Sequence, residues 1–246
     1  MRAVTEPWRG PVLVTGTDTE VGKTVVTAAV AAAAGAAGLR VAVVKPAQTG
    51  MDPGGDPGTA GESDVDVVLR LAAPASARAL ATYPEPLAPL AAARVAQLPP
   101  LTLDTALDAV RADAAAYDLV LVEGAGGLLA PMGEGWTLAD LAVNLGCPAL
   151  VVARPGLGTL NHTALTLEAL RRRGLDARVV IGAWPAVPEL VHLSNLVALA
   201  PDLAGVVPDG ASGMDSGVFR RSAPGWFTPL LYGSVDDVRQ WAEPVH

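Results

Sequence analysis

The chain has 246 residues, of which 51% are hydrophobic but only 4% aromatic, so Ala, Val and Leu must fill its core. This length suits one large α/β domain or two small ones, and we predict a single domain over residues 1–246. A formal net charge of −8 argues against a nucleic-acid-binding protein, which needs a basic stripe on its surface.

Targeting and membrane signals are missing from the sequence. The first residues lack an apolar signal-peptide core, and no stretch reaches the roughly 18 apolar residues of a membrane helix. Cys147 is the only cysteine, which excludes an intramolecular disulfide framework and fits a reducing compartment. We therefore expect a cytoplasmic protein with no membrane partner.

Lysine is scarce in this chain. Among 17 basic residues only Lys23 and Lys45 are lysine, and the rest are arginine. The composition, rich in Ala, Gly, Pro and Arg, is typical of GC-rich coding, under which lysine drifts to arginine wherever arginine serves. Lys23 and Lys45 are therefore candidates for positions that need a compact ammonium group.

The first elements form a βαβ unit. We predict a strand over 11–15, a loop over 16–22, a helix over 23–37 and a second strand over 40–44. A helical crossover of this length implies that the two strands are parallel.

The loop of this unit reads Gly16-Thr17-Asp18-Thr19-Glu20-Val21-Gly22-Lys23-Thr24. Backbone N–H groups in such a loop, together with the helix N-terminus, bind a triphosphate. Lys23 would reach the β- and γ-phosphates, and the Thr24 hydroxyl would ligate Mg²⁺. Five residues separate Gly16 from Gly22, whereas four are usual, and Thr17 stands where the first glycine is expected. The Gly-Lys-Thr ending and the strand–loop–helix context still predict nucleotide binding.

Lys45 follows the second predicted strand, in Lys45-Pro46-Ala47-Gln48-Thr49-Gly50. The carboxyl ends of strands in an open α/β sheet face the ligand, so Lys45 should lie beside the phosphate loop. A second cation there could hold an anionic substrate group next to the γ-phosphate, and Thr49 could donate a hydrogen bond to the same substrate.

A Gly- and Pro-rich loop over 51–61 is open to two interpretations, a mobile connection or a flap near the site. The helix predicted over 63–71 opens with Asp64 and Asp66, which compete as a carboxylate ligand of Mg²⁺. Acids at a helix start are also ordinary caps. Residues 83–89 are too Pro-rich for either regular structure.

A helix with an apolar stripe is predicted over 102–116, followed by a buried strand over 118–122. Glu123 ends that strand, where nucleotide enzymes place a Mg²⁺-side carboxylate, although it could instead cap the next turn. The glycines of Gly124-Ala125-Gly126-Gly127 then allow the backbone to approach a ligand closely.

The remaining predicted elements continue the alternation of strands and helices. Leu157-Gly158-Thr159-Leu160-Asn161-His162 opens one of these helices, and free N–H groups at such a start bind carboxylates well. The strands are predicted over 148–153, 177–181 and 203–207, and the helix over 160–173. The pattern predicts a doubly wound, mostly parallel sheet with helices on both faces. We expect residues 211–246 to pack on this body.

These motifs, in this order and spacing, resemble those of the dethiobiotin synthetases of the P-loop NTPase superfamily. The motifs concerned are Gly16–Thr24, Lys45-Pro46 with Thr49-Gly50, Val122–Gly127 and Gly158–His162. The resemblance covers about residues 11–208 and implies a P-loop NTPase-like fold.

The resemblance also implies a reaction, in which 7,8-diaminopelargonate and CO₂ or bicarbonate are converted to dethiobiotin at the expense of ATP. It assigns catalysis to Thr19, Lys23 and Lys45, and Mg²⁺ binding to Thr24, Asp64 and Glu123. Nucleotide-binding residues would be Glu20, Val21, Gly22, Lys23, Thr24, Val25, Asp64, Glu123, Gly124, Ala125, Gly126, Val207, Pro208 and Asp209. Substrate would be bound by Thr49, Gly158, Thr159, Leu160 and Asn161. The family is homodimeric, with the helix start at 158–161 reaching the neighbouring subunit's site.

The sequence departs from the family pattern at one place, which concerns recognition of the nucleotide base. The family often has Asn-Asp after the strand at 177–181, where the Asn reads adenine, but here the chain runs Gly182-Ala183-Trp184-Pro185. Nucleoside triphosphates other than ATP are therefore expected as substrates.

Two alternative functions remain. One is a non-enzymatic nucleotide switch, such as a partition or division-site ATPase of the same superfamily; those proteins usually carry a lysine early in the loop, where this chain has Asp18. The other is a related amide-forming ligase of cofactor synthesis, which usually carries an added glutaminase domain. Cys147 precedes Pro148 and a buried strand, which indicates a structural residue and not a nucleophile.

Overall fold

The computed structural model describes residues 6–51 and 62–242. The sequence left two interpretations open for the loop over 51–61, a mobile connection or a flap near the site. Apart from Met51, this loop lies outside the described residues. Among the residues described, no helix combines the length and the apolar character that crossing a bilayer requires.

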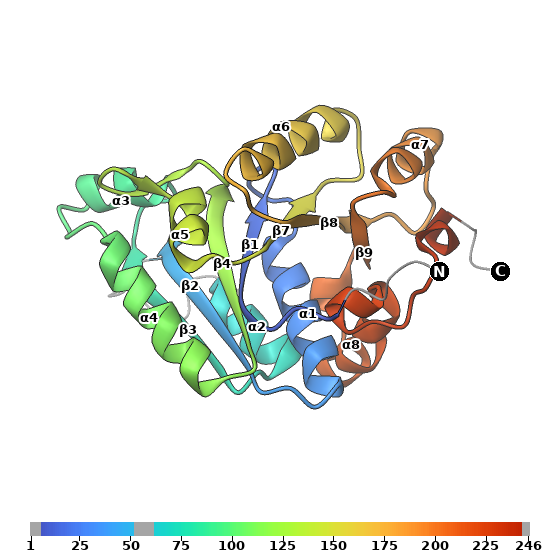
Figure 1. The fold of residues 1–246 in the computed structure, drawn as a ribbon, viewed down its shortest axis with the longest axis horizontal. Helices are drawn as coiled ribbons and strands as arrows, with labels where there is room; N and C mark the ends of the chain where they lie inside the picture. The colour runs from blue at the N-terminus through green and yellow to red at the C-terminus, as the bar shows by residue number, and fades with distance from the viewer. Residues whose placement is uncertain (1–5, 52–61, 243–246) are drawn as a thin grey trace.

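One sheet of seven strands runs through the middle of the molecule, and every pairing in it is parallel (Figure 1). The strand order is β3-β2-β4-β1-β7-β8-β9, so the chain runs from β1 out to β3 on one side, returns to β4 beside β1, and continues through β7 to β9 on the other side. The strands are β1 (Gly10–Gly16), β2 (Val41–Thr49), β3 (Ser76–Tyr83), β4 (Leu119–Gly127), β7 (Ala149–Ala153), β8 (Ala177–Trp184) and β9 (Leu203–Pro208). This confirms the predicted doubly wound parallel sheet.

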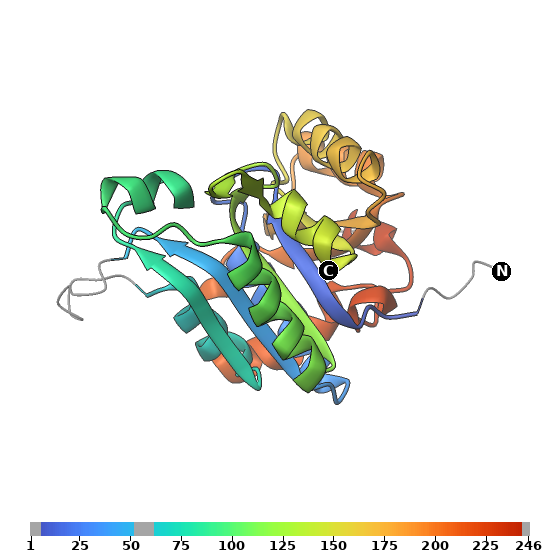
Figure 2. The same ribbon diagram turned by 60° about the vertical axis from the view of Figure 1, so that its left-hand side comes forward.

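Helices cover both faces of this sheet and enclose two hydrophobic cores. The turned view in Figure 2 shows α4 on the opposite face of the sheet from α2. One core packs under α1 (Lys23–Ala36), α2 (Asp64–Ala72) and α8 (Ser216–Ser222). The other packs under α3 (Pro89–Val95), α4 (Leu103–Ala116), α5 (Leu138–Leu145), α6 (Thr159–Arg171) and α7 (Leu190–Leu199). A small antiparallel pair, β5 (Pro131–Gly133) and β6 (Trp136–Thr137), precedes α5.

Three strands run several residues past their predicted ends. β8, predicted to end at residue 181, continues to Trp184, and the other two are β2 and β4. The expected ends were residues 44 and 122, but β2 continues to Thr49 and β4 to Gly127. Lys45 and Glu123 therefore lie inside their strands and do not follow them. β2 is extended because it pairs along most of its length with β3, a strand that was not predicted. β4 is extended through its pairing with β1, which reaches Gly127.

The Pro-rich segment 83–89 was expected to lack regular structure, and this was wrong at both ends. Tyr83 is the last residue of β3, and its ring is buried with only 2% exposed. Pro89 is the first residue of α3, a position where its missing N–H costs nothing. Proline here marks the helix start.

The segment after β9 lies against the body of the protein. It consists of α8 and the short 3-10 helices η1 (Ala211–Gly213), η2 (Ala223–Trp226), η3 (Pro229–Leu231) and η4 (Val238–Ala242). Phe219 and Phe227 are fully buried in the core beneath α1, where they pack among Val, Ala and Leu side chains. Five of the ten aromatic residues of the chain lie in this segment, which therefore provides a large share of the aromatic packing.

Candidate active site

The loop between β1 and α1 wraps around the N-terminus of α1. Gly22 is the N-cap residue of α1 and has a φ of 91°, a left-handed conformation that favours glycine. The following residues therefore begin the helix with their N–H groups directed toward the loop. This is the geometry that binds phosphate at a helix start.

Lys23 folds back over this loop. Its Nζ lies 2.9 Å from the backbone oxygen of Asp18, and its side chain is largely buried. Burial, and after it the nearby Lys45 ammonium, lowers the pKa of Lys23 from its ordinary value. Two cations thus lie close together at the mouth of the loop, an arrangement that an anionic ligand would stabilise.

Three oxygen-bearing side chains converge beside Lys23. The Thr24 hydroxyl lies 2.9 Å from Oδ1 of Asp64 and 2.8 Å from Oε1 of Glu123. Asp66, the competing acid, instead completes a capping box with Ser63 at the start of α2. The structure thus brings together the three predicted Mg²⁺ ligands.

This donor set fits Mg²⁺. A hydroxyl and two carboxylates are hard oxygen ligands, and Mg²⁺ in nucleotide sites takes one or two carboxylates and completes its shell with phosphate and water. Within the described ranges, no group of three or more His, Cys, Asp and Glu side chains could hold a metal. The arrangement thus suits a metal ion that is bound together with a triphosphate.

Lys45 joins the two carboxylates. Its Nζ lies 2.9 Å from Oε1 of Glu123 and also forms an ion pair with Asp64, while only 4% of the residue is exposed. Burial acts to lower the pKa of Lys45, but Glu123 and Asp64 outweigh it and raise that pKa above its ordinary value. The two carboxylates therefore favour the charged ammonium form of Lys45.

The backbone places Lys45 and Glu123 where two strands separate. The pairing of β2 with β4 ends at Val44 and Val122, one residue before each of these side chains. Pro46 has no N–H to donate to a neighbouring strand. Beyond this fork, β4 has an irregular register against β1 between Glu123 and Gly127, a feature common next to active sites.

A cleft of about 400 Å³ opens at the fork. Its lining includes most residues predicted for the phosphate and metal side of the site, as well as Thr49 from the end of β2. The lining residues are Thr19, Glu20, Gly22, Lys23, Thr24, Val25, Lys45, Gln48, Thr49, Asp64, Glu123, Gly124, Ala125 and Gly126. Val21 is buried beneath the loop and lines neither this cleft nor the next.

A second cleft of about 190 Å³ adjoins the first, with Glu20, Gly22 and Val25 common to both. It contains the three predicted nucleotide residues that follow β9, namely Val207, Pro208 and Asp209. Its remaining lining is Gly182, Ala183, Gly210, Ala211 and Ser212.

The predicted substrate residues at the start of α6 line neither cleft of the single chain. The Thr159 side chain is fully buried, and the backbone N–H of Thr159 donates to the oxygen of Gly156. Leu160 and Asn161 are exposed, and Leu157 before them is 89% exposed. Of this segment, the surface is therefore formed by Leu157, Gly158, Leu160 and Asn161.

Sequence reasoning did not identify two site residues. Gln48 is 8% exposed in the first cleft, and its Oε1 accepts a hydrogen bond from the Asp64 N–H at 3.3 Å. Its place between Lys45 and Thr49 was the available signal. Arg154, just after β7, forms an ion pair with Asp18 of the phosphate loop, and no pattern in the sequence pointed to it.

Structures with the same fold are known. The chain resembles the MinC:MinD cell division protein complex of Aquifex aeolicus, with a TM-score of 0.52, 14% identity, and coverage of 96% of this chain and 98% of that one. It also resembles a ParA family ATPase from Chlorobium tepidum, with a TM-score of 0.53, 12% identity, and coverage of 93% and 97%. At such low identity these likenesses show the fold alone.

Sequence relatives are far more similar. The model of a family described as an AAA domain matches residues 11–208. ATP-dependent dethiobiotin synthetase BioD of Streptomyces avermitilis is 51% identical over 91% of this chain and 94% of that protein. The protein of the same name from Rhodococcus jostii is 53% identical over 87% of this chain and 93% of that protein. The one from Saccharopolyspora erythraea is 52% identical over 90% of this chain and 96% of that protein. At about half identity over most of both sequences, the chain belongs to the ATP-dependent dethiobiotin synthetase family.

Proposed function

We propose that this protein is an ATP-dependent dethiobiotin synthetase that closes the ureido ring of dethiobiotin from 7,8-diaminopelargonate and CO₂. One amine of the substrate adds to CO₂, giving a carbamate and releasing a proton. A carbamate oxygen takes the γ-phosphoryl group of ATP, and ADP leaves. The second amine attacks the carbonyl carbon of this mixed anhydride and expels phosphate.

The observation that carries this proposal is the position of Lys45. Its ammonium is buried at the fork between β2 and β4, in the same cleft as Lys23 and Thr24. Nucleotide switches of this superfamily usually carry their additional lysine early in the loop, where this chain has Asp18, and they give no reason for a lysine buried within β2. A carbamate is an anion that must lie beside that phosphate, and a protonated lysine can hold it there.

The phosphate side of the cleft is assigned to the ends of β1 and β4. The backbone N–H groups of the loop, the Lys23 ammonium and the glycine-rich end of β4 at Gly124–Gly126 would receive the triphosphate. Thr24, Asp64 and Glu123 would hold Mg²⁺, which when bound neutralises charge on the transferred phosphoryl group. Thr19 and Thr49, which line the same cleft, would contact phosphate or substrate.

The nucleoside would lie in the second cleft. It shares Glu20, Gly22 and Val25 with the first cleft, so a ligand can extend from one to the other. Neither Gly182 nor Ala183 carries a side-chain amide that could read a base edge. Recognition of the base would then depend on the backbone, on shape and on the polar side chains of Asp209 and Ser212 that line the same cleft.

The substrate pocket is assigned to two subunits. The exposed start of α6, with Asn161 and the N–H groups of the first turn, suits the carboxylate of diaminopelargonate. Because this segment lies outside both clefts of its own chain, we assign it to the site of a homodimer partner. The 89% exposed Leu157 and the 58% exposed Leu165 give this surface an apolar character that supports an interface. The proposed setting is the cytoplasm, where ATP is available.

Phosphate release measured with purified protein tests the proposal. It should depend jointly on diaminopelargonate, bicarbonate, Mg²⁺ and ATP, and dethiobiotin should appear by mass spectrometry in equal amount. ATP hydrolysis that ignores the diamine would instead indicate a nucleotide switch. Phosphate release that needs glutamine or ammonia would indicate an amide ligase. Either result would refute the proposed synthetase.

A further inference from the structure

Asp18 is connected to three parts of the site. Its Oδ1 accepts the Thr19 N–H at 2.8 Å, and its Oδ2 accepts a hydrogen bond from Nη2 of Arg154 at 2.7 Å. Its backbone oxygen accepts from Nζ of Lys23 at 2.9 Å. The position of Asp18 therefore fixes both the Thr19 amide and the lysine that faces the triphosphate.

Arg154 reaches the loop from a different part of the chain. It follows β7, the strand next to β1, and the end of that strand also accepts the Thr17 N–H at the oxygen of Val152, at 2.9 Å. The loop is thus tied to the end of β7 twice, once through the backbone and once through the Arg154–Asp18 pair. The buried Nε of Arg154 has no hydrogen-bond partner among the residues described, so the carboxylate of Asp18 is the acceptor that holds the guanidinium.

The ion pair is too exposed to serve mainly for stability. The side chains of Arg154 and Asp18 are 43% and 49% exposed, and surface pairs of this kind add little to the free energy of unfolding. Holding a loop in its binding shape, however, lowers the conformational cost of binding a ligand. The effect of the pair should therefore appear in ligand affinity rather than in melting temperature.

We propose that Arg154 is a positioning residue of the nucleotide site, which acts through Asp18 to hold the phosphate loop in the shape that receives the triphosphate. This inference depends on one part of the proposed function, namely that the loop binds a nucleotide. Arg154 would contact neither the nucleotide nor the diamine.

The test compares Arg154→Gln, Asp18→Asn and the double variant. The affinity of the protein for a non-hydrolysable ATP analogue with Mg²⁺ is measured by titration calorimetry. Each single variant should weaken binding by about fivefold to tenfold, and the double variant should be no weaker than either single one, because both changes remove the same interaction. Arg154→Lys keeps a cation and should recover part of the affinity. If the enzyme is active, KM for ATP should rise while kcat stays near its original value.

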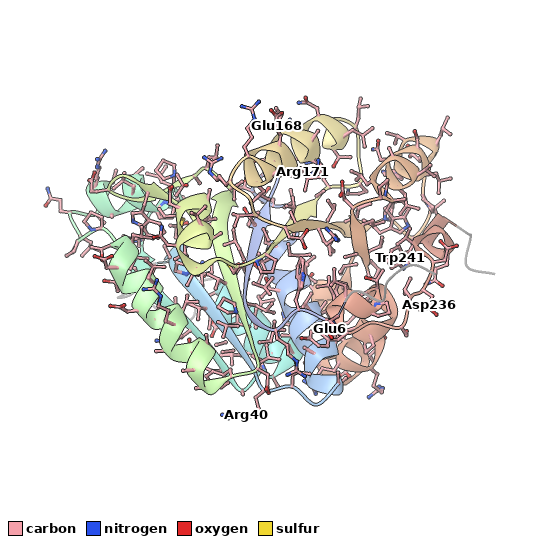
Figure 3. All side chains as sticks on the ribbon, viewed as in Figure 1. Glu6, Arg40, Glu168, Arg171, Asp236 and Trp241 are labelled. Atoms are coloured by element: carbon pink, nitrogen blue, oxygen red, sulfur yellow. The ribbon has the colours of Figure 1, made fainter. Side chains whose placement is uncertain are left out.

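Arg171→Gln is the matched control. Arg171, labelled on α6 in Figure 3, forms an ion pair of the same kind with Asp202 at 3.0 Å, away from both clefts. Its loss should leave nucleotide affinity unchanged, and all variants should melt near the same temperature as the original protein.

Three results would overturn the proposal. Unchanged affinity in a folded Arg154→Gln protein would show that the pair does not shape the loop. Additive losses in the double variant would show that the two residues act separately. A loss for Arg154→Gln with none for Asp18→Asn would show that the arginine contacts the ligand itself. Because the readout is binding, a protein that fails to make dethiobiotin would still allow this test.

Discussion

Lys23 and Lys45 show how neighbouring charged groups set the direction in which the pKa of a buried lysine shifts. Both are buried, and burial acts to lower the pKa of each. Lys23 faces another cation and its pKa falls, whereas Lys45 lies against Glu123 and Asp64 and its pKa rises. The scarcity of lysine in the sequence singled out both residues. The opposite pKa shifts depend on how side chains from distant elements pack around each lysine, and this packing could not be predicted from the sequence.

Replacing Lys45 by arginine should lower turnover by about 10²-fold, the scale expected when a charge-stabilising contact is displaced. The guanidinium keeps the charge but is larger and planar, at a position that is only 4% exposed. Nucleotide affinity should change little, because the triphosphate is held by the loop and Lys23. Steady-state kinetics and calorimetry on the same preparation check both parts, and near-normal turnover would contradict the role assigned to Lys45.

Base selectivity should be weak. Gly182 and Ala183 contribute no amide to the second cleft, and one base-reading hydrogen bond is worth about 1–1.5 kcal/mol. GTP or CTP should therefore support dethiobiotin synthesis within roughly tenfold of ATP. A panel of nucleoside triphosphates measured under identical Mg²⁺ concentrations checks this. Strict dependence on ATP would show that the backbone or another side chain reads adenine.

At the scale of elements, the sequence predicted the central strands and the long helices well. Continuous apolar runs marked β1, β4 and β7, and glycine after residues 37 and 173 marked two helix ends. The extension of β2 to Thr49 was missed because it depends on β3, whose residues carry no run of large apolar side chains. Pairing between distant strands leaves no local signal, so the fork beside Lys45 became visible only in the fold.

The contact between β8 and the phosphate loop leads to a prediction about Gly182. A Cβ at this position would lie 2.3 Å from the backbone oxygen of Val21. Gly182→Ala must therefore push the loop away from the sheet, at a cost of about 1–3 kcal/mol of stability and with weaker nucleotide binding.

The matched control is Gly213→Ala, since a Cβ at Gly213 would meet nothing within 4 Å. Urea unfolding and calorimetry on both variants make the comparison. If Gly182→Ala binds nucleotide as well as Gly213→Ala does, the loop is not held by this close contact.

At the scale of the whole molecule, the proposed homodimer can be tested by complementation. Chains with Lys45→Ala and chains with Asn161→Ala should each be inactive, because one lacks the carbamate cation and the other the carboxylate donor. In a two-fold dimer each site combines Lys45 of one chain with Asn161 of the other. A mixed dimer then has one site with both defects and one with neither, so each mixed dimer should have about half the activity of the original dimer. Random exchange of a 1:1 mixture makes about half of the dimers mixed, so the whole mixture should recover about a quarter of the original activity.

This experiment needs single variants that are folded and dimeric, which light scattering and circular dichroism establish. The separately purified, unmixed variants serve as the baseline. If verified mixed dimers remain inactive, the pocket lies within one chain or the two sites are coupled, and the assignment of the α6 start to the partner's site fails.

The fork between β2 and β4 has a consequence for amide hydrogen exchange. Leu119 to Val122 are paired with strands on both sides, β1 and β2, whereas the residues beyond Glu123 have lost β2 as a neighbour. Their N–H groups are therefore less protected until a ligand covers them. Binding of a Mg²⁺–nucleotide complex should slow exchange at Gly124–Gly127 far more than at Leu119–Val122. In this sheet, the break in pairing that makes room for the ligand also makes the local stability of β4 depend on that ligand.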